Sequence, residues 1–147
     1  MEKIIWIILA FAAGSILPVQ GGLNARLGKA AGNPETAALI SFAVGTVALL
    51  IYMLITRPQI SWDGLRQLNL FTWTGGILGA FYVTVMVLAY PRLGPGVTFG
   101  LVVAGQMSVS LFMEHYNVLV ANAQPVNWYR LAGMVLVVGG VILIRKF

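Results

Sequence analysis

The chain has 147 residues, of which 59% are hydrophobic and 9% are charged, and its formal net charge at pH 7 is +5. Soluble domains carry about 25% charged residues, so this composition excludes a water-soluble globular domain and indicates a membrane protein. The lysines and arginines are scattered singly or in pairs between apolar runs; they form no basic helix face, which argues against a nucleic-acid partner. The absence of cysteine excludes disulfides and thiolate metal sites.

Five apolar runs are each long enough to cross a membrane. A helix rises ~1.5 Å per residue, so about 17 to 25 residues span the ~30 Å hydrocarbon core. The sequence therefore predicts an all-α membrane protein with a single five-helix transmembrane domain over residues 1–147. The expected spans are approximately residues 4–23, 35–55, 70–89, 96–113 and 128–144.

The stretch LPVQGGLNARLG, residues 17–28, brings polar groups to the end of the first run. Counting from the start of the run places Gln20 ~24 Å along the helix, close to an interface, with Asn24 one turn further out. We therefore expect a helix end here, with the alternative that both residues line the vestibule of a polar path. Ser15 and, in the second run, Thr46 lie closer to the midplane and are further candidates for lining a cavity.

Local signals separate the runs. The segment Asn33-Pro34-Glu35 combines a capping residue, a first-turn proline and an acid near the positive end of the helix dipole, so it predicts a helix start. Arg57-Pro58 ends the second run, and the proline- and glycine-rich residues 91–96 predict a tight turn between the third and fourth runs.

The fourth run carries a polar stripe. Gln106 lies ~15 Å from the start of this run, near the midplane, and Ser110 and Glu114 follow at four-residue intervals on one helix face. Such a glutamine either makes an interhelical hydrogen bond, worth about 0.6 kcal/mol on average, or lines a substrate cavity with Ser110. Glu114 is either an interfacial helix end or a coupling or gating group. His115 has no second ligand at metal spacing, so no metal site is expected.

Small residues recur at four-residue spacing in the third and fourth runs. Such faces let helices approach closely, either within the bundle or between copies. In the fourth run this stripe lies beside the polar stripe, so one side of the helix can pack tightly while the other lines a cavity. The candidate packing residues are Gly75, Gly79, Gly96, Gly100, Ala104 and Ser108.

Positive charge is almost balanced across the membrane. With five spans, the side that holds the N-terminus carries four basic residues, Lys3, Arg57, Arg66 and Arg130. The opposite side carries five, Arg26, Lys29, Arg92, Arg145 and Lys146. An excess of basic residues fixes orientation. Two alternatives remain: one strong loop such as residues 26–29 decides the topology, or copies insert both ways and pair antiparallel.

No catalytic constellation is present in the sequence. It has no Ser/His/Asp set, no paired carboxylates and no phosphate-binding loop after a strand, and GGILGA at residues 75–80 lies inside an apolar span, where packing explains it better. We expect neither an enzyme nor a cofactor.

Two sets of motifs carry a family resemblance. The stretches VQGGLNARLGKAAGNPETAALISFAVGT and VVAGQMSVSLFMEH resemble the YdcZ-like family of small five-span bacterial membrane proteins. The segments around residues 88–96, Glu114 and residues 133–144 resemble the closing three helices of drug/metabolite transporter repeats, the superfamily to which that family belongs. The likeness covers nearly the whole chain.

The resemblance implies a bacterial inner-membrane transporter with one five-helix repeat. Ten-helix relatives contain two inverted repeats, so a single repeat is expected to work as an antiparallel homodimer or with a paired paralogue. The implied partners are the lipid bilayer and a small metabolite. The protein is expected to move this metabolite by alternating access. Small multidrug-resistance relatives carry a glutamate in their first helix, whereas residues 14–16 here are Gly, Ser and Ile. A passive channel and a non-transporting membrane subunit remain alternatives.

Overall fold

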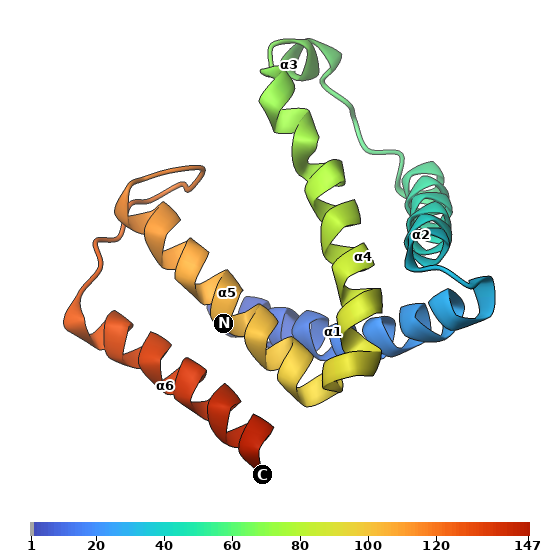
Figure 1. The fold of residues 1–147 in the computed structure, drawn as a ribbon. Coiled ribbons are helices and arrows are strands. Elements are labelled where there is room, and N and C mark those ends of the chain that lie inside the picture. Colours follow the sequence, from blue (N-terminus) through green and yellow to red (C-terminus); the bar gives the residue numbers. More distant parts are fainter. Residues whose placement is uncertain (1) are drawn as a thin grey trace. The chain divides into compact units, whose positions relative to one another are not determined.

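The computed structural model describes residues 2–147, which fold entirely into helices and their connections (Figure 1). The elements are α1 (Glu2–Ala31), α2 (Pro34–Thr56), α3 (Trp62–Arg66), η1 (Leu70–Thr74), α4 (Gly75–Leu93), α5 (Pro95–His115) and α6 (Trp128–Lys146). Five candidate membrane spans are found among the described residues, with η1 and α4 together forming the third. The predicted all-α class with five transmembrane helices is confirmed.

Helix α1 does not end where the polar stretch begins. It continues through Pro18 to Ala31, so the whole of residues 17–28 is helical and the predicted helix end is wrong. Gly21, Asn24 and Gly28 are buried; their spacing of three and four residues puts them on one face of the helix. Tertiary packing along this face therefore sustains a helix that the polar residues alone would not predict.

The boundaries of α2 follow the capping signals. The Asn33 side chain accepts a hydrogen bond from the backbone N–H of Thr36 at 2.8 Å, and Pro34 opens the helix. At the other end Arg57 adopts a left-handed conformation with φ 46°, and its N–H donates to the carbonyl of Met53 at 2.8 Å. Both ends agree with the sequence prediction.

The turn between α4 and α5 is shorter than predicted. Helix α4 runs through Pro91 to Leu93, and Gly94 alone separates it from α5. Pro91 lies in the last turn of α4, where it removes one i→i−4 hydrogen bond and helps to end the helix. Gly94 has φ 76°, which glycine adopts without the Cβ penalty, and Pro95 suits the first turn of α5.

The chain divides into two compact units, one up to Pro91 and one from Arg92 onward. In the first unit α1 packs beside α2. Ala37 and Ala38 of α2 form a buried cluster with Val83 and Val87 of α4. In the second unit α5 and α6 lie side by side in opposite directions (Figure 1).

Most apolar side chains of the spans are exposed. Phe11 of α1 is 78% exposed and Leu54 of α2 is 75% exposed. Contiguous apolar surfaces of this kind are rare on soluble proteins and mark contact with lipid or with protein. The apolar faces of these helices are therefore suited to a bilayer.

Candidate functional site

A half-open groove of about 250 Å³ lies among three helices of the first unit. Its lining residues are Gln20 from α1, Ser41, Phe42, Gly45, Thr46 and Leu49 from α2, and Val83 from α4. The five α2 residues share one helix face because they are separated by one, three or four positions. Two residues predicted as cavity lining, Gln20 and Thr46, thus meet in one groove although they come from different helices.

The polar groups of the groove are all neutral. The Thr46 hydroxyl donates to the carbonyl of Phe42 at 2.8 Å, so its proton is used within the helix while its oxygen remains an acceptor. Gln20 contributes a side-chain amide, whose NH2 group donates hydrogen bonds and whose oxygen accepts them. Ser41 contributes a second hydroxyl. The groove can therefore hydrogen-bond a ligand, but its lining supplies no charge to pair with one.

Two glycines control the space around the groove. A Cβ at Gly79 of α4 would lie 3.2 Å from Cζ of Phe42, so this glycine lets the Phe42 ring lie against α4. A Cβ at Gly45 would meet nothing within 4 Å, although Gly45 lines the groove. Gly75, also predicted to pack, has no such neighbour within 4 Å.

The other candidates on α1 lie outside the groove. Asn24 is 5% exposed and belongs to the packed face that includes Gly28, where a Cβ would lie 2.6 Å from Cγ1 of Val87. Ser15 is exposed, and its hydroxyl donates to the carbonyl of Phe11 at 2.9 Å. Of the three α1 candidates, Gln20 alone lines the groove.

In the second unit the small stripe of α5 faces α6. A Cβ at Gly96 would lie 3.4 Å from Cγ2 of Ile144, and one at Gly100 would lie 2.8 Å from Cγ2 of Val141. The Ser108 hydroxyl lies 3.4 Å from Sδ of Met134. Ala104, which falls between Gly100 and Ser108 at the same spacing, is half-buried.

The polar stripe of α5 remains exposed. Gln106 and Ser110 are both exposed, on the part of α5 that the contacts with α6 leave open. Thr98, near the start of the helix, is 2% exposed, and its hydroxyl oxygen has no hydrogen-bond partner within residues 2–147. No sequence signal distinguishes Thr98 from the other threonines of the spans.

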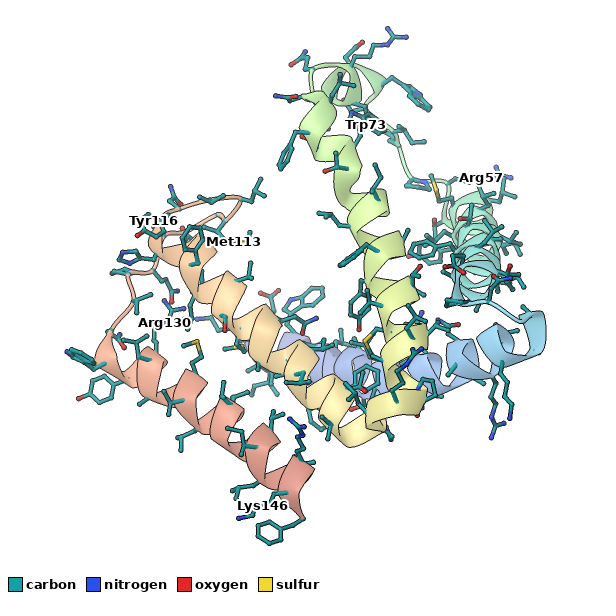
Figure 2. The ribbon with its side chains drawn as sticks, in the orientation of Figure 1. Arg57, Trp73, Met113, Tyr116, Arg130 and Lys146 are labelled. Atoms are coloured by element: carbon teal, nitrogen blue, oxygen red, sulfur yellow. The ribbon has the colours of Figure 1, made fainter. Side chains whose placement is uncertain are left out.

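Glu114 forms an ion pair that the sequence analysis did not predict. Its carboxylate binds the guanidinium of Arg130, which extends from the first turn of α6 towards the end of α5, where Met113 and Tyr116 lie (Figure 2). Arg130 also donates to the carbonyl of Gln124 at 2.8 Å. The Gln124 N–H in turn donates to the Glu114 carbonyl at 3.0 Å, so the pair holds the α5–α6 connection to both helices.

Helix dipoles explain why these two charges need each other. Glu114 lies at the negative end of α5 and Arg130 at the positive end of α6. Each charge is therefore at the helix end that disfavours it. The pair offsets both penalties, and partial burial, with side chains 24% and 28% exposed, limits screening by solvent.

A charge swap tests this account. Glu114→Arg and Arg130→Glu should each place like charges together and destabilise the α5–α6 connection by roughly 1 to 2 kcal/mol. The double swap restores the ion pair and puts each charge at the helix end that the helix dipole favours. It also removes the hydrogen bond between Arg130 and the Gln124 carbonyl. Hydrogen exchange of residues 116–127 should therefore be faster in both single variants and recover most of its protection in the double one. A double variant as labile as the singles would contradict the pairing.

Five apolar helices, three of which line a neutral polar groove, define a helical multi-pass membrane protein. Residues 5–143 match the protein family described as "Putative inner membrane exporter, YdcZ". The chain belongs to this family, which confirms the resemblance seen in its motifs. It is accordingly a multi-pass inner membrane protein, and the description of its family is that of an exporter and not of an enzyme.

One similar protein extends the comparison along the full chain. It is the Inner membrane protein YdcZ of Escherichia coli (strain K12), which is 26% identical over 152 residues. The alignment covers 99% of this chain and 98% of that protein. No solved structure matches this chain.

Proposed function

We propose that this chain exports a small neutral metabolite across the inner membrane by alternating access, with the groove as its substrate site. The observation that carries the proposal is the meeting of Gln20 and Thr46 in one groove between apolar helices. Thr46 lies ~18 Å along α2 from Pro34, near the middle of the span. A hydroxyl at this depth, with an amide reaching the same groove, is typical of transporter sites.

We further propose that the working unit is an antiparallel pair, formed by two copies or by this chain and a paralogue. The groove is half-open in the single chain, so a second wall is needed to shield a polar substrate from lipid. The exposed Gln106 and Ser110 of α5 are suited to that wall. Glu114, held by Arg130, would act as a gate that opens when the α5–α6 connection moves.

Efflux from proteoliposomes tests the transport activity. Vesicles containing the purified chain are loaded with a neutral metabolite mixture, and efflux is followed by mass spectrometry. Saturable efflux with counterflow supports a transporter. Non-saturating flux would indicate a channel, and no flux with a co-purifying partner would indicate a subunit; either result overturns the proposal.

Matched threonine variants locate the site within that assay. Thr46→Val removes the hydroxyl inside the groove. Thr56→Val removes an equivalent hydroxyl on the same helix, which donates to the carbonyl of Tyr52 at 2.9 Å outside the groove. We expect roughly a two- to tenfold loss of efflux for Thr46→Val, because one lost hydrogen bond costs about 0.5 to 1.5 kcal/mol, and little change for Thr56→Val.

The topology of the pair is tested by labelling. Basic residues are divided four to five between the two sides, so insertion should be almost unbiased. An N-terminal tag should therefore be accessible from both faces of the membrane. A shift to a single face is expected when lysines are added next to Lys3. Labelling of the unmodified chain from one face alone would contradict the antiparallel homodimer.

A further inference from the structure

We infer that the groove of the first unit selects uncharged molecules of about ten non-hydrogen atoms, and that Gly45 sets this size limit. The inference deepens the proposed function and rests on it, because it names the substrate class of the same site. It follows from the charge, the volume and the glycine content of the groove.

The chemistry of the lining excludes charged ligands. Three of its residues are neutral polar groups, Gln20, Ser41 and Thr46, and the remaining four are apolar or glycine. Transfer of a charge into the centre of a membrane helix is unfavourable enough to weaken binding roughly 100-fold unless a counter-charge offsets it. A neutral ligand with one or two hydrogen-bonding groups instead finds acceptors and donors beside the Phe42 ring.

The volume of the groove sets the size of its ligand. Drug-sized ligands occupy sites of about 300 to 1,000 Å³, which exceeds the groove's volume of about 250 Å³. An apolar cavity of about 150 Å³ accommodates benzene, so simple scaling gives about ten non-hydrogen atoms here. Bulky aromatic cations are therefore excluded by size as well as by charge.

Gly45 keeps this volume open. A side chain added there meets no atom within 4 Å of its Cβ, and since Gly45 lines the groove, the added atoms enter the space that a ligand would fill. Leucine also has a higher helix propensity than glycine. Gly45→Leu should therefore block the groove without destabilising α2.

Binding to the purified full-length chain in nanodiscs tests the inference. The neutral probes are nicotinamide, benzamide and benzyl alcohol. The charged analogues, of nearly equal size, are the nicotinate anion and the 1-methylnicotinamide cation. Binding is measured as thermal stabilisation at millimolar concentrations, because a ligand of the native state raises the apparent stability. We expect saturable stabilisation by at least one neutral probe and at least tenfold weaker binding of both charged analogues.

Two variants tie the binding to the groove. Gly45→Leu should abolish stabilisation by the neutral probe while the unliganded protein unfolds at an unchanged or higher temperature. Gly14→Leu, at a position on α1 that is also open within 4 Å and lies outside the groove, should leave binding intact. Thr46→Val should weaken binding several-fold and serves as a second test if Gly45→Leu unfolds.

The outcomes separate this inference from the proposed function. Three results would each overturn the substrate class, even if efflux is found. The first is that none of the three neutral probes binds, and the second is that a charged analogue binds as tightly as the neutral probe or more tightly. The third is that binding does not change in Gly45→Leu and Thr46→Val. Neutral binding lost in Gly45→Leu, with no efflux from proteoliposomes, would support the groove chemistry and overturn export.

Discussion

Gly28→Leu should strongly destabilise the first unit, whereas Gly14→Leu on the same helix should not. A Cβ at Gly28 would lie 2.6 Å from Cγ1 of Val87 and 3.6 Å from Cβ of Ala37. These neighbours belong to the buried cluster that joins α2 and α4, so α1 would be pushed away from both helices. Inserting extra methylene groups into a packed core costs about 1 to 3 kcal/mol, and a leucine adds several.

The measurement for this pair is the unfolding temperature of the purified variants in detergent. A Cβ at Gly14 would meet no neighbour within 4 Å, so the leucine variant at this position controls for hydrophobicity and for the removal of a helical glycine. Because Val83 of the same cluster also lines the groove, Gly28→Leu should lose ligand binding together with stability. Equal unfolding temperatures for the two variants would contradict the packing of α1 described above.

Gly100→Leu should separate α5 from α6. A Cβ at Gly100 would lie 2.8 Å from Cγ2 and 3.1 Å from Cγ1 of Val141, which is 7% exposed. Valine is restricted at χ1, so its methyl groups cannot easily turn aside. We expect loss of the hairpin packing and, with it, loss of assembly and transport.

The matched control lies on the same helix. A Cβ at Gly105 meets nothing within 4 Å, so Gly105→Leu should leave the unfolding temperature nearly unchanged. Val141→Ala should partly rescue Gly100→Leu, since the two residues are in contact and their effects should not add. Strict additivity of the two substitutions, or a normally stable Gly100→Leu, would contradict this contact.

Local signals predicted much of the fold. The number of membrane-spanning helices follows from the lengths of the apolar runs. Both ends of α2 follow from residues that act within one helical turn, Asn33 and Arg57. The end of α1 was not predictable in this way. Its polar residues resemble a helix end, yet the burial of Gly21, Asn24 and Gly28 depends on helices that arrive later in the chain.

The same distinction holds for the candidate site. Depth along each helix identified Gln20 and Thr46 separately, but the groove they share depends on how α1 packs against α2, which periodicity does not encode. The pairing of Glu114 with Arg130 crosses an irregular connection, residues 116–127, for which helical spacing gives no register. Four-residue spacing made Gly100 a candidate packing position, and Val141 lies against it within the chain.

Under the proposed function, the groove between α1, α2 and α4 is the polar path through this protein. Because the chain has no cysteine, single-cysteine labelling tests this directly. Thr46→Cys lies in the groove, whereas the neighbouring Val47→Cys lies on the exposed apolar side of α2. A membrane-impermeant maleimide should label Thr46→Cys in membrane vesicles, more slowly when a neutral probe is bound, and leave Val47→Cys unlabelled. An unreactive Thr46→Cys, or equal labelling of both positions, would contradict the claim.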